Sequence, residues 1–255
     1  MTEDDPYADP ALYDLEYADH TEDITYYQRL AIGAGGPILE LGCGTGRLTL
    51  PMIRMGARVD GVDLARTMLE GLRLKVAALD ATQQGRVRFY EADFRELPDH
   101  LRTDYTLIIW PFNALHHCRD ERDVERTLAG AVSRLAPGGT VALDVYLPDR
   151  QLYDRDPSKT YEHRIFKDPR SGLPLHTWEQ GWWDEASRTH HVVYTYKHRN
   201  GTLERAHLAL RMFERDELEA IFAKVGLRVV QEAEDFEGTP TTPTSLKWVI
   251  RLQRA

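Results

Sequence analysis

A glycine-rich turn near residue 42 is the segment of the sequence best suited to binding a ligand. Residues 40–46 read Glu-Leu-Gly-Cys-Gly-Thr-Gly and follow a short apolar run at residues 37–41. Because Gly42, Gly44 and Gly46 lack a Cβ atom, they tolerate positive φ and allow a ligand to approach the backbone closely. By itself the pattern is equally compatible with an ordinary tight turn between a strand and a helix.

Two carboxylates follow the next two apolar runs. Asp63 ends the run at residues 58–63, and Asp93 follows the run at residues 87–90. If these runs are parallel strands, the turn and both acids meet at the edge of the sheet where α/β proteins bind ligands. Asp63 is then suited to the hydroxyls of a ribose and Asp93 to the exocyclic amine of an adenine. Alternatively, each acid is the N-cap of the helix that follows it.

The elements that carry these residues alternate between short β-branched runs and longer helical patterns, which predicts βαβ units and a parallel sheet. The expected strands are residues 37–41, 58–63, 87–90, 105–110, 140–146, 227–233 and 246–252, and the expected helices are residues 48–55, 65–80, 120–135 and 214–225. A tight turn is expected at Pro137-Gly138-Gly139. We therefore expect an α/β fold with a doubly wound, mostly parallel sheet of seven strands.

Between the fifth and sixth strands the pattern becomes that of an antiparallel meander. Four consecutive strands are expected there, at residues 161–166, 175–183, 188–198 and 203–213, with Asn200-Gly201 as the hairpin turn between the last two. We accordingly divide the chain into a helical N-terminal lid segment at residues 1–36, a core at residues 37–147 and 213–255, and an antiparallel β insertion at residues 148–212.

This set of segments resembles the class I S-adenosylmethionine-dependent methyltransferases, a Rossmann-like fold. Besides the acidic residue and Gly-x-Gly-x-Gly turn of residues 40–46, the resemblance rests on VDGVDLARTML (59–69), EADFRELP (91–98), IIWPFNALHH (108–117) and LAPGGTVALDV (135–145). A nicotinamide dinucleotide fingerprint instead requires Gly or Ala at the position occupied by Arg47. The resemblance implies S-adenosylmethionine as cofactor, a last strand antiparallel beside the sixth, and an insertion that serves as a substrate lid.

The resemblance also implies which residues contact the cofactor. Glu40 would orient the turn or hold the methionine ammonium through water, while Leu64 and Phe94 would flank the adenine. The full set expected to bind the cofactor is Tyr13, Tyr17, Tyr26, Glu40, Gly42, Gly44, Gly46, Asp63, Leu64, Asp93, Phe94 and Trp110. The three tyrosines resemble those that small-molecule members place over the methionine end, and they are alternatively packing residues of a leading helix.

The insertion supplies the candidate acceptor site. Its aromatic side chains either attract a cationic amine through their π faces or form the insertion's own small core. The residues expected to bind the acceptor are Trp178, Trp182, Tyr194 and Arg211. On the last strand of the insertion Arg211 shares a face with His207 and Ala209, so it either clamps an anionic group of the acceptor or lies on the surface.

Methyl transfer depends mainly on holding nucleophile, methyl and sulfur in line, so no covalent catalyst is expected. A general base is required only for a nucleophile that arrives protonated. His117 is the expected base because its segment faces the cofactor cleft in the family, and Asn113 is the second expected catalytic residue.

Composition limits the expected partners. The 255 residues include 41 acidic and 32 basic side chains, giving a formal charge of -9 that disfavours nucleic acid. Cys43 and Cys118 have no zinc-ligand spacing, and the adjacent histidines at 116–117 and 190–191 would point to opposite faces of a strand, so no metal is expected. The N-terminal residues do not resemble a signal peptide, and the most apolar stretch, residues 105–115, is too short to span a bilayer. We expect a cytoplasmic monomer or homodimer with a small-molecule acceptor.

The leading hypothesis is therefore an enzyme that transfers the methyl group of S-adenosylmethionine to an amine nitrogen or hydroxyl oxygen of a small polar metabolite. Nitrogen is favoured by the aromatic insertion. The alternatives are an NAD-dependent oxidoreductase, disfavoured by Arg47, and a non-catalytic cofactor-binding module that regulates a partner.

Overall fold

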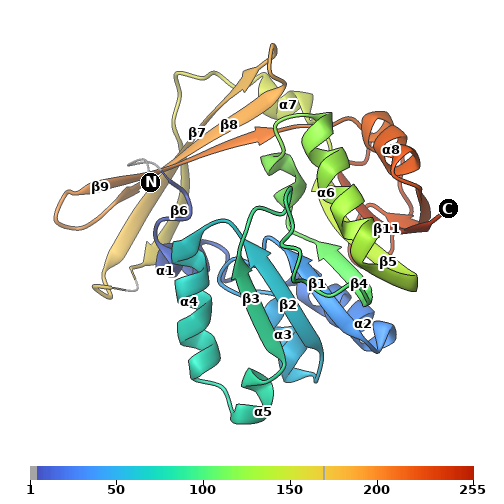
Figure 1. The fold of residues 1–255 in the computed structure, drawn as a ribbon. Helices are drawn as coiled ribbons and strands as arrows, with labels where there is room; N and C mark the ends of the chain where they lie inside the picture. The colour runs from blue at the N-terminus through green and yellow to red at the C-terminus, as the bar shows by residue number, and fades with distance from the viewer. Residues whose placement is uncertain (1–4, 169) are drawn as a thin grey trace.

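The computed structural model describes residues 5–168 and 170–255 and contains two β-sheets (Figure 1). The larger sheet has the order β10-β11-β5-β4-β1-β2-β3. Its strands are β1 (Pro37–Leu41), β2 (Arg58–Asp63), β3 (Val87–Glu91), β4 (Tyr105–Trp110), β5 (Leu135–Tyr146), β10 (Leu227–Ala233) and β11 (Lys247–Arg254). The pairs from β5 through β3 are parallel, and β11 is antiparallel to both of its neighbours. The expected doubly wound, mostly parallel sheet of seven strands is confirmed.

Helices cover both faces of this sheet. On one face, α2 (Glu22–Ala34), α3 (Thr49–Arg54) and α4 (Arg66–Ala77) bury a cluster that contains Tyr27, Ile53 and Leu72. On the other, α6 (Glu121–Arg134) and α8 (Arg215–Lys224) bury a cluster that contains Leu128 and Phe222. This burial of both faces explains why the strands of the core read as nearly continuous apolar runs.

Three boundaries differ from those expected. The first core helix begins at Thr49, which places Pro51 in its first turn, where a missing N–H costs little. The second ends at Ala77 and is followed by a separate short helix, α5 (Ala81–Gln84). The turn expected at residues 137–139 lies within β5, as an irregularity between the pairs Tyr105–Leu135 and Leu107–Thr140.

The second sheet has four antiparallel strands in the order β6-β7-β8-β9. They are β6 (Tyr161–Lys167), β7 (Pro174–Asp184), β8 (Thr189–Lys197) and β9 (Leu203–Arg211), each close to its expected range. At the expected hairpin turn Gly201 has φ 87°. In Figure 1 this sheet, coloured yellow to orange, lies to one side of the core. Two short helices not expected from the sequence contact it in space: η1 (Ala114–His117) contacts β9, and α7 (Arg150–Tyr153) contacts β7.

The N-terminal helix α1 (Pro10–Glu16) contacts both the core and the insertion. Its Asp14 bonds to the Thr45 hydroxyl and pairs with Lys75 of the core, both at 2.5 Å. On its other side Asp9, the N-cap of the helix, pairs with Arg170 of the insertion at 3.2 Å. Helix α1 therefore bridges the core and the insertion.

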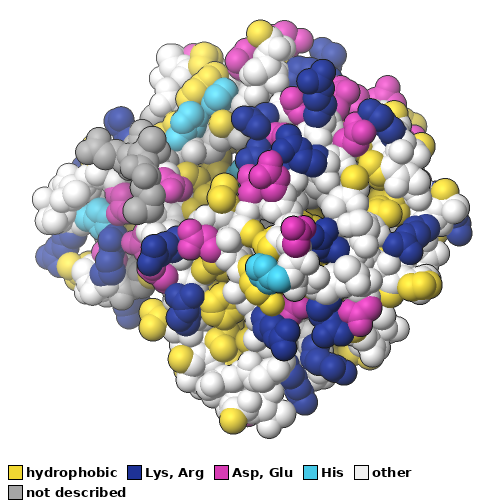
Figure 2. Space-filling model, viewed as in Figure 1, with side chains coloured by type: hydrophobic (Ala, Val, Ile, Leu, Met, Phe, Trp, Pro, Cys, Tyr) yellow, Lys and Arg dark blue, Asp and Glu magenta, His cyan; other side chains and the backbone are white. Residues whose placement is uncertain are grey.

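The surface shown in Figure 2 carries basic and acidic side chains interspersed with one another. Across residues 5–168 and 170–255, no helix has both the length and the apolar character needed to cross a membrane.

Candidate functional site

A first cavity of about 440 Å³ lies against the glycine turn and the ends of β1, β2 and β3. These segments are remote in sequence and meet because the three strands are parallel neighbours. Of the residues expected to bind the cofactor, the walls include Tyr13, Glu40, Gly42, Gly44, Asp63, Leu64, Asp93 and Phe94.

The glycine turn is tied to the end of β2 by backbone hydrogen bonds. Its φ angles are 76° at Gly42, 52° at Gly44 and 85° at Gly46, all in the left-handed region that favours glycine. The amide of Gly42 donates to the Val62 carbonyl at 2.9 Å, and that of Gly44 donates to Asp63 Oδ2 at 2.7 Å. Asp63 therefore shapes the turn in addition to facing the cavity.

Glu40 is buried and Asp63 is half-buried, and both carboxyl groups have raised pKa values. Burial raises the pKa of Asp63, against the effect of hydrogen bonds from the amides of Ala65 and Gly44. Burial also raises the pKa of Glu40 to about 8, although the Thr49 hydroxyl donates to its Oε2 at 2.5 Å. Glu40 therefore holds a proton at neutral pH in the ligand-free chain, and a cation in the cavity would favour its ionised form.

Asp93 faces the first cavity while already paired with Arg95. The Arg95 guanidinium donates to both carboxylate oxygens, the shortest contact being 2.6 Å to Oδ2, and holds the pKa of Asp93 below its usual range. Beside it, Phe94 packs edge-on against Trp110 with 5.2 Å between ring centroids. An amine at Asp93 would therefore share the carboxylate with Arg95.

Gly46, Tyr26 and Trp110 lie behind the walls of the two cavities. A Cβ at Gly46 would collide with the side chain of Leu72 on α4, so this glycine serves the packing of the turn. Tyr26 packs against Tyr27 and Phe236, with centroids 5.2 and 5.5 Å away, and Trp110 is fully buried in the core. The expected direct contact of these three residues with the cofactor is therefore corrected to a supporting position.

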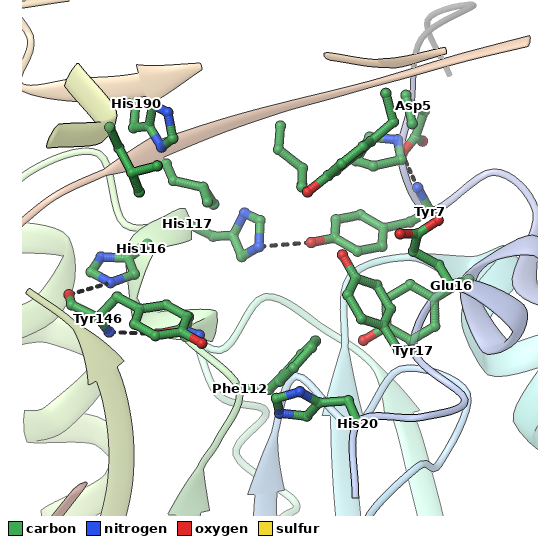
Figure 3. A pocket seen from close by; sticks show the side chains of 18 of the residues that line it. Asp5, Tyr7, Glu16, Tyr17, His20, Phe112, His116, His117, Tyr146 and His190 are labelled. Atoms are coloured by element: carbon green, nitrogen blue, oxygen red, sulfur yellow. Dashed lines mark hydrogen bonds between the residues drawn. The ribbon is translucent and has the colours of Figure 1, made fainter. Parts of the chain in front are cut away.

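A second cavity, of about 430 Å³, lies between the core and the insertion (Figure 3). Its walls come from α1, η1, α7, β8 and β9 and include the predicted residues Tyr13, Tyr17, Asn113, His117 and Tyr194. Asp5, Tyr7, Tyr13, Phe112 and His117 line both cavities, so the two adjoin at a shared wall.

Tyr7 and His117 meet at this shared wall. A hydrogen bond of 2.7 Å joins the Tyr7 hydroxyl to His117 Nε2, as Figure 3 shows. Burial lowers the pKa of His117 to about 4 and raises that of Tyr7, so both side chains are neutral at pH 7. Tyr7 was not expected here, because its acidic, proline-flanked segment shows no periodicity that would place it on any element.

Phe112 and Asn113 follow β4 in the left-handed region, with φ of 57° and 58°. The ring of Phe112 packs edge-on against Tyr17 with centroids 4.9 Å apart and lies beneath the Arg47 guanidinium, 4.4 Å from its centroid. Asn113 Oδ1 accepts a hydrogen bond from the Tyr146 amide at 2.6 Å. Phe112 was missed by the sequence analysis, although it lies inside the segment that carried the resemblance.

One face of the insertion's sheet lines the second cavity. On β9 this is the face that carries the leucines. Leu208 and Leu210 line the cavity, as do Tyr194 and Tyr196 of β8. Trp178 pairs with Thr195 and Trp182 with His191, which lie on the opposite face because side chains alternate along a strand. The predicted acceptor contacts of Trp178 and Trp182 are corrected by this register. Trp183, on the cavity side, stacks on Tyr153 with centroids 4.1 Å apart, and Tyr153 lines the cavity.

Arg211 likewise lies outside both cavities. Its guanidinium donates to the Met212 carbonyl, lies 3.5 Å from Glu217 on α8 and stacks over Phe213 at 4.4 Å. The structure supports neither alternative for Arg211, because it lines neither cavity and its side chain is only 11% exposed. Arg211 is held at the junction between the insertion and the core.

The two adjacent histidine pairs, 116–117 and 190–191, are held by separate contacts. Contrary to expectation, His116 and His117 lie on the short helix η1, where His116 is bonded to the carbonyls of Arg211 and Tyr146 at 2.8 and 3.0 Å. His190 lines the second cavity, whereas His191 is bonded to His207 at 3.0 Å on the other face of the sheet. No cluster of three or more potential His, Cys, Asp or Glu ligands occurs in the described part of the chain.

Comparison with known proteins finds similarity to methyltransferases. Residues 38–139 match the family described as "Methyltransferase domain". The curated "Putative methyltransferase YqeM" of Bacillus subtilis is 22% identical over 86% of this chain and 85% of its own length. Other curated methyltransferases match at 30–34% identity, but this chain spans only about two fifths of their length.

Solved structures resemble the whole chain. The CcbJ methyltransferase from Streptomyces caelestis is 22% identical, with a TM-score of 0.81 and complete coverage of both chains. CalS10, described as an amino pentose methyltransferase from Micromonospora echinaspora and solved with S-adenosylmethionine bound, is 18% identical, with a TM-score of 0.70 over 96% of this chain and 97% of its own. At these identities the likeness shows a shared fold, including the antiparallel insertion within the aligned length.

Proposed function

We propose that this chain is a class I S-adenosylmethionine-dependent methyltransferase that methylates an amine nitrogen or a hydroxyl oxygen of a small metabolite, nitrogen being favoured. The observation that carries the proposal is the pair of adjoining cavities. The first is built around the glycine turn, the second around the insertion, and the two share a wall at Tyr7, Tyr13, Phe112 and His117. A methyl group crossing that wall would pass directly from donor to acceptor.

The residues of the first cavity fit S-adenosylmethionine. Gly42 and Gly44 present backbone without a Cβ, the half-buried Asp63 and the buried Glu40 supply carboxylates for a cationic ligand that bears ribose, and Phe94 supplies an aromatic wall. Bound there, the cofactor supplies an electrophilic methyl group on a sulfonium. The chain's own contribution is to hold that group and the acceptor in line and to exclude water, which accounts for much of the barrier in favourable cases.

His117 is the base that we propose for an acceptor that arrives protonated. It is a neutral imidazole at the shared wall, bonded through Nε2 to Tyr7. With a pKa of about 4 His117 is a weak base at pH 7, so it would receive the proton only as the N–H or O–H of the acceptor becomes acidic during formation of the bond to the methyl group. Asn113 supports this segment through its hydrogen bond from the Tyr146 amide.

The preference for nitrogen rests on the walls of the second cavity. Tyr17, Tyr153, Tyr194 and Tyr196 surround it with aromatic rings, which attract a cationic amine. A structurally similar protein is described as acting on an amino pentose. We propose that residues 148–212 are a substrate-binding cap, that the N-terminal segment closes the site, and that the acceptor is a small molecule because the cavity has about 430 Å³.

The test is to incubate the chain with S-adenosylmethionine labelled in its methyl group and with metabolite pools, and to identify the labelled product by mass spectrometry. A small product heavier by one methyl group supports the proposal. Titrations with S-adenosylmethionine, S-adenosylhomocysteine and NAD accompany it. Tight NAD binding without S-adenosylmethionine binding would favour an oxidoreductase, and cofactor binding with no product from any pool would favour a regulatory module.

A further inference from the structure

Phe112 and Asn113 have a backbone conformation that non-glycine residues rarely adopt. In the described part of the chain only one other non-glycine residue, Arg188, has a positive φ. Such a conformation is unfavourable and persists only where surrounding contacts impose it, and these outliers cluster at functional sites. Here the outlier coincides with the shared wall of the two cavities, which Phe112 lines on both sides.

The contacts that impose it come from a buried carboxylate on β5. The Phe112 amide donates to both oxygens of Asp144, at 3.0 and 3.1 Å, and the Asn113 amide donates to the Asp144 carbonyl at 3.3 Å. The Tyr27 hydroxyl donates to Asp144 Oδ1 at 2.5 Å. Asp144 is 3% exposed and Tyr27 fully buried.

The ring of Phe112 is held by a second buried carboxylate. The Arg47 guanidinium that stacks on the ring forms two hydrogen bonds to Asp23, at 2.7 and 2.5 Å, and Asp23 is fully buried. Asp23 and Tyr27 are four residues apart on α2 and therefore share one face of that helix. Helix α2 thus supports Phe112 indirectly in two ways. One of its residues binds the carboxylate that accepts from the Phe112 amide, and the other binds the guanidinium that stacks on the Phe112 ring.

None of the three residues Asp23, Tyr27 and Asp144 lines the first or the second cavity. We propose that Tyr27 and Asp144 are positioning residues for methyl transfer, which act by holding Phe112 in the left-handed conformation at the shared wall and so align the acceptor with the methyl group. This inference rests on the proposed function. It adds that a contact network outside both cavities determines how fast a bound acceptor reacts, while leaving the affinity for the cofactor unchanged.

The test compares Tyr27→Phe with Tyr26→Phe. The first removes only the hydroxyl that bonds to Asp144, and the second makes the same change in the adjacent tyrosine, which packs on Tyr27 and Phe236. The rate of amide hydrogen exchange over residues 110–117 reports directly how firmly the backbone of Phe112 and Asn113 is hydrogen-bonded, and its measurement needs no methyl acceptor. We expect faster exchange there in Tyr27→Phe and no change in Tyr26→Phe.

The second part of the test measures activity and cofactor affinity. Activity is measured as transfer of the labelled methyl group to the acceptor identified in the metabolite pools, and affinity as the Kd of S-adenosylhomocysteine. In Tyr27→Phe we expect kcat to fall about tenfold or more, while the Kd of S-adenosylhomocysteine stays within about twofold. Asp144→Asn, which keeps one acceptor oxygen, is expected to retain more activity than Asp144→Ala.

Unchanged exchange over residues 110–117 in Tyr27→Phe overturns the inference, as does a Kd that rises in step with the loss of kcat. Faster exchange with unchanged kcat also overturns it, because the network would then be purely structural. If the wild-type chain methylates nothing, the proposed function fails with the kinetic arm, while the exchange result still decides whether Tyr27 and Asp144 hold Phe112.

Discussion

Tyr7 and His117, 110 residues apart in the chain, are joined by a hydrogen bond of 2.7 Å at the wall between the two cavities. The tyrosine comes from the N-terminal segment and the histidine from the helix that follows β4. The bond therefore closes the N-terminal segment over the point where a methyl group would cross. Both groups are half-buried and neutral at pH 7, so the site offers a proton acceptor without a fixed charge.

Replacing His117 with Gln tests its role as a base. A general base contributes about 10²-fold or more, so kcat on the identified acceptor should fall by that order, with little change in the Kd of S-adenosylhomocysteine. His100→Gln, at an exposed histidine whose ring lies against Tyr90, is the matched control. A loss in His117→Gln of less than about threefold would mean that positioning alone drives transfer.

Cofactor binding should release a proton near neutral pH. Glu40 has a pKa of about 8 in the ligand-free chain and is therefore mostly protonated at pH 7. A cationic cofactor in the first cavity favours the ionised carboxylate, lowers this pKa and expels up to about one proton per cofactor bound.

Titration calorimetry at pH 7 in buffers of different ionisation enthalpy measures this release. The apparent binding enthalpy should depend on the buffer for the wild-type chain and much less for Glu40→Gln, which carries no ionisable group at that position. An enthalpy independent of the buffer in the wild-type chain contradicts the assignment.

Asp63→Asn should weaken cofactor binding. The carboxylate accepts hydrogen bonds from Gly44 and Ala65 and is expected to hold the ribose, so both the turn and the ligand lose a charged partner. We expect the Kd of S-adenosylmethionine to rise about tenfold to a hundredfold. Asp80→Asn, at the N-cap of α5, should leave it unchanged. Wild-type affinity in Asp63→Asn would remove Asp63 from the cofactor site.

Gly46→Ala should lower the free energy of unfolding, because Gly46 serves the packing of the turn and lines neither cavity. Gly46 has φ 85°, and a Cβ there would collide with Leu72, so we expect a loss of about 1–3 kcal/mol in the free energy of unfolding measured in urea. Gly138→Ala provides the comparison, because Gly138 has φ 75° but open space around it. Equal losses in the two variants would show that the collision is absent.

The two faces of the insertion's sheet should differ in their effect on the acceptor. Tyr194 lines the second cavity, whereas Trp182 stacks on His191 at 4.7 Å on the opposite face. Tyr194→Ala is expected to raise KM for the identified acceptor about tenfold, and Trp182→Ala to leave it within about twofold. A larger effect from Trp182 in kinetic measurements would indicate that the sheet presents its other face.

Much of the fold follows from local pattern. The strands β1, β2, β4 and β10 have the ranges expected. For β1 and β4, whose residues are mostly buried, the reason is that a strand covered on both faces has to be largely apolar. The expected turn at residues 137–139 was wrong in a specific way. Pro-Gly-Gly marks a local break in hydrogen bonding, and only the pairing of β5 with β4 shows that the strand continues through it as an irregularity.

The first cavity is predictable from the sequence, because a glycine turn and two carboxylates at the ends of parallel strands meet at one edge of the sheet. The second cavity is not predictable in this way. The alternation of side chains along β8 and β9 shows which residues share a face, but no local pattern shows which face turns toward the cavity. For this reason the expectation that Trp178, Trp182 and Arg211 line the cavity is wrong. The same holds for Tyr7 and Phe112: one reaches the shared wall from a segment without periodicity, and the other holds its unfavourable backbone through Asp144, 32 residues away.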